Sequence, residues 1–150
     1  KQALVAEITT ELADAAKRDR PELRSAAKQL RESLDSDLWV DGNHLVVKEG
    51  EHVFQDEKGA VQKLEQLLED KKADVADATL NRWIATLTAA DRALAQIALD
   101  ETTAAGGDAK KLADATKEMA KAAAELAKGG GSNAIEHYKK AWKKAQESLK

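Results

Sequence analysis

Apolar residues recur at intervals of three and four positions along most of this chain, the spacing that gathers side chains on one face of an α-helix. Leu4, Ile8 and Leu12 form such a row near the start, and Ile135 and Tyr138 belong to one near the end. A helix of this kind is stable only when its apolar face packs against another element. The pattern therefore predicts an all-α protein, an antiparallel helical bundle of about five to six helices.

Capping and turn-forming residues indicate where these helices begin. Asp19, Pro21 and Glu22 have the arrangement of a helix start, with an Asp cap and a proline in the first turn. In residues 108–150, two segments with apolar residues every seven positions predict an antiparallel helical hairpin. We expect this hairpin to form the C-terminal end of a single domain that covers residues 1–150.

The run Gly129-Gly130-Gly131-Ser132 joins the two helices of the expected hairpin. Three successive glycines have the composition of a flexible linker, because ordering glycine costs more backbone entropy than ordering any other residue. The run fits a natural loose loop and an engineered junction equally well.

The composition excludes several classes of site and partner. Alanine supplies 30 of the 150 residues and cysteine none, which excludes disulfides, thiolate metal sites and cysteine nucleophiles. No apolar stretch approaches the roughly 18 to 20 residues of a membrane-spanning helix. The net charge is −3, from 24 basic and 27 acidic side chains, so the chain lacks the basic surface field that attracts nucleic acids.

A start at Lys1 without a visible signal peptide suggests a processed product or a domain of a longer chain.

One long ordered loop is expected to interrupt the bundle, because the helical spacing fails over about residues 35–54. Two structures are open for it. Its Asp and Asn side chains could accept hydrogen bonds from nearby backbone N–H groups in an irregular loop. Alternatively, residues 38–40 and 45–47 could pair as the short strands of a hairpin. In both cases Trp39 is a candidate for a partner contact or for anchoring the loop.

The same loop carries candidate metal ligands. Asp37, Asp41 and Asn43 offer oxygen atoms of the kind that calcium prefers, but only Asp41 falls in the register of a helix-loop-helix calcium site. His44 and His52 offer nitrogen ligands to zinc, although no recognised ligand spacing relates them. Calcium or zinc bound by these five residues is one hypothesis, and a purely structural loop is the other.

Asp91 occupies a position between Leu87 and Leu94 where the helical spacing calls for an apolar residue. A buried carboxyl group needs a polar partner, and the loop backbone, a Trp indole N–H or an arginine of the second helix could supply one. We expect Asp91 to anchor the loop around Trp39 rather than to take part in catalysis.

No residue pattern in the chain predicts catalysis. Gly-rich segments lack the Lys and Ser or Thr of a phosphate-binding loop, and no Ser, Thr or Lys is placed beside a base by the sequence. We therefore expect no enzyme, no catalytic residues and no organic cofactor.

The last hairpin resembles the second half of a tetratricopeptide repeat, because Gly129, Ala134, Tyr138 and Ala141 have that motif's small-small-aromatic-small spacing. The earlier positions of the motif are not met, and no period of about 34 residues recurs upstream. The likeness implies a helical hairpin and not an array of repeats.

A larger part of the chain resembles helical modules found at the ends of large secreted or surface bacterial proteins. The segments that carry this likeness are LWVDGNHL at 38–45, VFQDEK at 53–58 and AIEHYKKAW at 134–142. The resemblance implies a secreted or cell-surface location and an appended module without catalytic residues. We expect a non-enzymatic structural or protein-interaction module that contacts its parent chain or a protein partner. A small metal-binding domain that uses loop residues 35–52 is the alternative.

Overall fold

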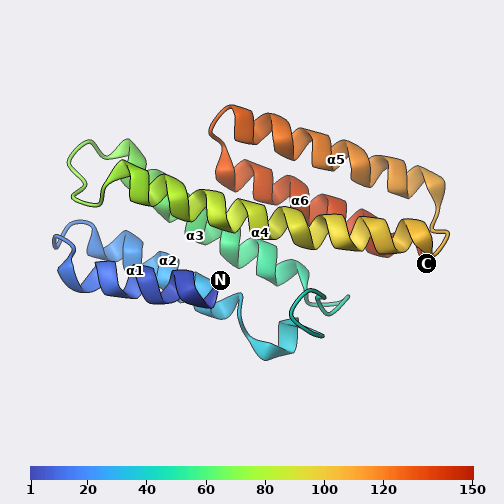
Figure 1. The fold of residues 1–150 in the computed structure, drawn as a ribbon, viewed down its shortest axis with the longest axis horizontal. Helices are drawn as coiled ribbons and strands as arrows, with labels where there is room; N and C mark the ends of the chain where they lie inside the picture. Colours follow the sequence, from blue (N-terminus) through green and yellow to red (C-terminus); the bar gives the residue numbers. More distant parts are fainter.

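The computed structural model describes all residues, 1–150, and confirms the prediction of an all-α bundle (Figure 1). It contains six α-helices and one short 3₁₀ helix. Their bounds are α1 Gln2–Asp14, α2 Arg20–Glu32, η1 Ser36–Leu38, α3 Glu51–Glu69, α4 Asp77–Ala104, α5 Ala109–Ala127 and α6 Gly131–Glu147. None of these helices is both long enough and apolar enough to cross a bilayer.

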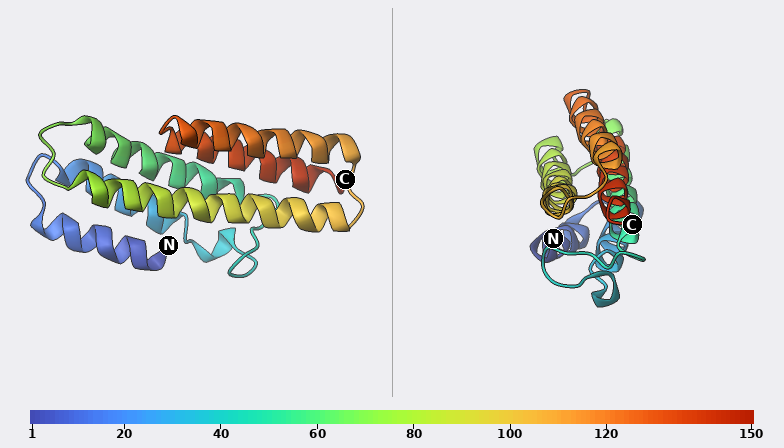
Figure 2. Two further views of the ribbon diagram at one scale, coloured as in Figure 1. Left: turned by 45° about the horizontal axis from the view of Figure 1, so that its top comes forward. Right: turned by 90° about the vertical axis from the view of Figure 1, so that its right-hand side faces the viewer.

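The molecule is elongated, and α4 runs along most of its length (Figure 2). The α1–α2 pair lies beside one half of α4, whereas the α5–α6 hairpin lies beside the other half. Between them, α3 packs on α2, α4 and α6, and α6 packs on α4. Helix α5 is the outermost element and packs mainly on α6. One side of α4 is therefore covered by other helices and the opposite side is not.

One continuous core joins all six helices. Its largest fully buried side chains are Trp83, Tyr138 and Phe54, and the rings of Phe54 and Trp142 lie 5.9 Å apart between centroids. Buried alanines such as Ala115 and Ala141 let α5 and α6 approach closely. Apolar burial of this extent is the main source of stability in a bundle without disulfides.

Helix starts follow the capping signals only in part. Asp108 caps α5 by accepting a hydrogen bond from the backbone N–H of Lys111 at 2.9 Å. Pro21 lies in the first turn of α2, as expected, but the Asp19 side chain does not cap that helix. Instead, the buried Asp19 accepts a hydrogen bond from the backbone N–H of Asp74 at 2.7 Å and ties the start of α2 to the segment before α4.

The glycine run between α5 and α6 is an ordered turn and a packing site rather than a loose linker. Gly129 ends α5 with a φ of +82°, in the left-handed region that favours glycine. Gly131 is the first residue of α6 and is buried. A Cβ atom at Gly131 would lie 2.7 Å from Cγ2 of Ile84 and 3.2 Å from Cγ1 of Val61. The close approach of α6 to α3 and α4 therefore depends on this glycine.

Candidate functional site

The expected loop joins α2 to α3, and it is shorter than residues 35–54 because α3 begins at Glu51. It forms a minimal hairpin with a single antiparallel bridge between Trp39 and Leu45. The backbone N–H of Val40 donates to the carbonyl of His44 at 2.8 Å, and that of Val46 donates to Leu38 at 3.0 Å. The irregular loop and the hairpin left open by the sequence are thus both partly realised.

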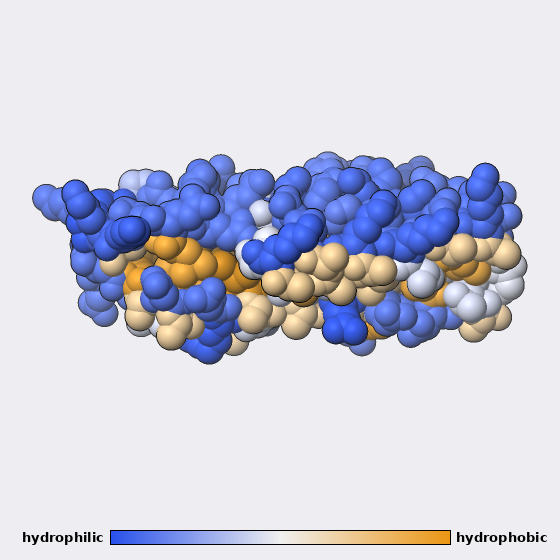
Figure 3. Space-filling view, turned by 90° about the horizontal axis from the view of Figure 1, so that it is seen from above, coloured by the Kyte–Doolittle hydropathy of each residue, from blue (hydrophilic) through white to orange (hydrophobic).

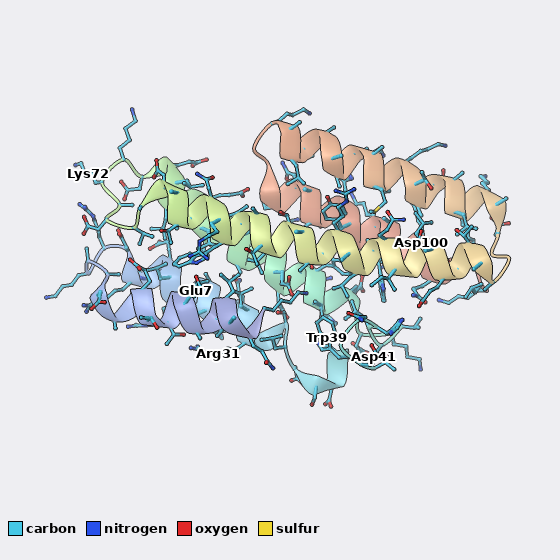
Figure 4. All side chains as sticks on the ribbon, in the orientation of Figure 1. Glu7, Arg31, Trp39, Asp41, Lys72 and Asp100 are labelled. Carbon is cyan, nitrogen blue, oxygen red and sulfur yellow. The ribbon has the colours of Figure 1, made fainter.

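Asp41 closes the tip of this hairpin through its side chain (Figure 4). Its Oδ1 atom accepts hydrogen bonds from the backbone N–H groups of Asn43 at 2.8 Å and His44 at 3.0 Å. These bonds and the His44 ring hold the pKa of the Asp41 carboxyl below its usual range. The carboxylate therefore acts as a turn-forming acceptor, as Asp commonly does in loops.

His44 fastens the tip of the loop to α4. Its Nδ1 atom lies 2.8 Å from Asp41, and its Nε2 atom lies 2.9 Å from Oε1 of Glu101. The Glu101 carboxylate and then the Asp41 carboxylate raise the pKa of the His44 imidazole above its usual value. Two carboxylates on opposite ring nitrogens favour the doubly protonated ring, because both nitrogens must then donate.

The structure brings together only some of the candidate metal ligands. Asp41, Asn43 and His44 meet at the loop tip, as described. Asp37 lies in η1, where its backbone N–H donates to the side chain of Asp35, and His52 lies in α3 with Nε2 3.3 Å from Glu49. No group of three or more His, Asp or Glu side chains is arranged to hold a metal ion.

Trp39 is half-buried and holds the loop against the bundle. Its indole N–H donates to the carbonyl of Ser33 at 2.8 Å, just after the end of α2. Its ring lies beneath the ammonium group of Lys1, with Nζ 4.9 Å from the ring centroid. This is a cation–π distance, so the ring and the ammonium attract each other.

Asp91 is fully buried, as its place in the apolar row indicated, but its neighbours are not the ones that the sequence suggested. Its Oδ1 atom lies 3.6 Å from Nζ of Lys1, and the Glu57 carboxyl group is also adjacent. Burial, followed by the charge of Glu57, raises the pKa of Asp91 well above its usual range. Asp91 reaches Trp39 only through Lys1, whose ammonium lies between them.

Lys1, Glu57 and Glu101 were not identified from the sequence. Glu57 carried the same signal as Asp91, since it lies in α3 among the core residues Phe54 and Val61 and is completely buried. A charged residue at a core position predicts a polar cluster. Lys1 and Glu101 carried no such signal, because the helix pairing that brings them to the loop and to Asp91 is set by the tertiary fold.

Open grooves flank the outward side of α4. A groove of about 630 Å³ lies between α4, the start of α1 and the Trp39 loop. A second groove of about 660 Å³ lies between α4 and the turn from α5 to α6, where Leu126 and Tyr138 line it. The exposed ridge of α4 formed by Ala85, Ala89 and Ala93 lines the second groove, and Ala93 also lines the first. In Figure 3, a band of apolar residues, broken in places by hydrophilic ones, runs along the lower part of the view, and the upper part is hydrophilic.

Comparisons with known proteins found no counterpart of this arrangement. No protein-family model, no curated protein and no solved structure matches the chain.

Proposed function

We propose that this chain is a non-enzymatic interaction module of a larger secreted or cell-surface protein, and that the outward side of α4 is its contact surface. The observation that carries the proposal is the uncovered apolar ridge of α4, which borders one open groove along its length and meets a second at Ala93. Monomeric proteins rarely leave long apolar surfaces free unless a partner covers them. The resemblance to modules at the ends of secreted bacterial proteins supplies the proposed location.

The chemistry of the ridge favours a helical protein segment as the partner. Ala85, Ala89 and Ala93 recur every four residues, so they form one row on the helix surface. Small side chains in such a row let a second helix approach closely, while larger apolar side chains of the partner enter the adjoining grooves. Polar groups such as Arg92 and Gln96 at the groove edge suit the rim of a protein interface.

Site-specific photo-crosslinking in the producing cells tests this proposal. A benzophenone amino acid is placed at Ala89 on the ridge, or at Ala123 of α5, which is also exposed, as a matched control. We expect a discrete protein adduct, or an intramolecular adduct with the parent chain, from position 89 and not from position 123. Mass spectrometry then identifies the partner segment.

A second variant tests whether the adduct at position 89 depends on a specific interface with α4 rather than on chance proximity. The substitution Ala93→Glu adds a charge one turn away from position 89, and it should reduce the adduct at least tenfold, because burying an unpaired charge in an interface is costly. Ala124→Glu on α5 is the matched control and should leave the adduct unchanged. Equal adducts from positions 89 and 123, or no adduct from either, would rule out α4 as the contact surface.

A further inference from the structure

Three ionisable side chains meet in the interior where α1, α3 and α4 approach one another. Nζ of Lys1 lies 2.7 Å from Oε1 of Glu57 and 3.6 Å from Oδ1 of Asp91. The two carboxyl groups are completely buried and the lysine side chain is 12% exposed. The ring of Trp39 lies against the ammonium, and Lys1 and Trp39 both line the adjoining groove.

An ordinary structural role does not account for this cluster. Lys1 Nζ and all four carboxylate oxygens of Glu57 and Asp91 are buried, and none has a hydrogen-bond partner outside the cluster. A buried ion pair offsets its desolvation cost only when additional hydrogen bonds satisfy the remaining lone pairs and protons. Apolar side chains of similar volume would suit these positions better, so the three groups call for a chemical explanation.

The arrangement has the parts needed for a condensation between an amine and an acid. Burial raises the pKa of Asp91 well above the usual range and so favours its neutral acid form. A neutral carboxylic acid is open to attack by an amine, whereas a carboxylate is not. Glu57 contacts the ammonium at 2.7 Å and can accept the proton that the amine must lose before it attacks.

We propose that Lys1 and Asp91 condense to an intramolecular isopeptide bond, with Glu57 as the group that transfers the protons. The three side chains are buried together, and Nζ of Lys1 lies 3.6 Å from Oδ1 of Asp91, close to the roughly 3 to 3.5 Å between the reacting atoms of a reactive complex. The lysine stem has four flexible carbons, so Nζ can cover the remaining distance to Cγ of Asp91. The inference is independent of the proposed partner surface on α4.

The proton and atom balance of the step is complete. Lys1 first gives one ammonium proton to the Glu57 carboxylate, and the neutral amine attacks Cγ of the Asp91 acid. The N–Cγ bond forms, the bond from Cγ to the acid hydroxyl breaks, and Glu57 returns its proton to the departing oxygen. A further proton from nitrogen passes to Glu57, so the products are an amide, water and a neutral Glu57. No oxidant or other reactant is needed, and the buried charges disappear.

The bond would join the start of α1 to the middle of α4. Helix α1 packs mainly on α2, at one side of the bundle, so it is the element that gains most from a covalent tie. A crosslink between residues so far apart in sequence restricts the unfolded chain over a long loop. A crosslink that stabilises the fold in this way suits a module that transmits force or resists proteolysis outside the cell.

Intact-mass spectrometry of the purified wild-type protein tests the proposal directly, under denaturing conditions and after incubation at neutral pH. We expect a mass lower than that of the sequence by one water molecule, about 18 Da. Trypsin does not cleave after an acylated lysine, so the digest should contain a peptide with residues 1–17 joined to residues 83–92. The full sequence mass, or a water loss that maps to other residues, would overturn the proposal.

Two variants assign the roles of the side chains. Lys1→Arg keeps the positive charge but cannot form the amide, and should restore the full mass, whereas the matched control Lys28→Arg at an exposed position should not. Glu57→Gln keeps the shape of the side chain but cannot accept a proton, so the crosslink should form at least 100-fold more slowly, about the contribution of a general base. An unchanged rate in Glu57→Gln would contradict the assigned proton transfer.

Discussion

The imidazole of His44 links the Trp39 loop to α4 through Glu101, with Nε2 of the ring 2.9 Å from Oε1 of the carboxylate. Nδ1 of the same ring lies 2.8 Å from Asp41. Both nitrogens donate only when the imidazole is protonated, and the pKa of His44 is accordingly raised, first by Glu101 and then by Asp41. The tip of the loop is therefore held most firmly when His44 carries its charge.

The first prediction concerns the pH dependence of this link. The folded-state pKa of His44 lies above its unfolded value, so the contribution to stability is fully present below the unfolded pKa and is lost as pH rises through the folded pKa. Glu101→Gln removes the largest cause of the shift. An NMR titration should therefore show a lower midpoint for His44 in this variant than in the wild type.

Glu49→Gln is the matched control for that titration, because Glu49 contacts His52 and not His44. It should leave the midpoint of His44 unchanged. The melting temperature of the wild type should also exceed that of Glu101→Gln by more at pH 6 than at pH 8. Identical His44 midpoints in the wild type and Glu101→Gln would contradict the bridge.

The second prediction concerns Gly131, where α6 begins against α3 and α4. A Cβ atom there would lie 2.7 Å from Ile84 and 3.2 Å from Val61, so Gly131→Ala forces these side chains or the helix to move. Overpacking of this kind costs about 1 to 3 kcal/mol in free energy of unfolding. Urea denaturation should show that loss. Gly42→Ala, which meets no atom within 4 Å, should change the stability little. Equal stabilities of the two variants would refute the packing role of Gly131.

The sequence predicts the helices well because their apolar spacing is a local property, and it places their ends less well. Helix α3 begins at Glu51, before the first apolar residue of its row, because the polar residues Glu51 and His52 open its first turn ahead of the buried Val53 and Phe54. Leu34 and Leu38 continue the apolar spacing of α2, but α2 ends at Glu32 and Leu38 belongs to η1. Apolar spacing thus identifies the buried side of a segment and not its secondary structure.

The candidate site is less predictable because it depends on which distant segments meet. The position of Asp91 in an apolar row indicates a buried acid, but Lys1 becomes its neighbour only through the packing of α1 beside α4. Gly131 shows the same limit from the other side. The glycine run that contains it has the composition of a flexible linker, and only the proximity of Ile84 makes Gly131 a packing residue.

The third prediction separates the contributions of the Trp39 indole hydrogen bond and of its aromatic ring to the free energy of unfolding. Trp39→Phe keeps an aromatic ring near Lys1 but loses the indole N–H that donates to Ser33 at 2.8 Å. The loss should lower the free energy of unfolding by about 0.5 to 1.5 kcal/mol. Trp39→Ala also removes the ring that lies against the Lys1 ammonium, together with its apolar contact area, so it should cost more. Equal losses in the two variants, measured by urea denaturation, would show that the ring contributes nothing.

The last prediction distinguishes the interaction module from a metal-binding domain. At the loop tip Asp41 already accepts two backbone hydrogen bonds, and both nitrogens of His44 are bound to carboxylates. A cation would have to displace these bonds and bind the neutral form of a histidine whose pKa is raised.

The melting temperature should therefore be the same with and without a chelator, and in added calcium or zinc. A metal ion that binds the folded state, at a free concentration of 100 times its Kd, would stabilise the fold by about 2.7 kcal/mol. A fall in melting temperature with chelator that is reversed by either ion, and abolished in His44→Gln, would favour the metal-binding domain instead.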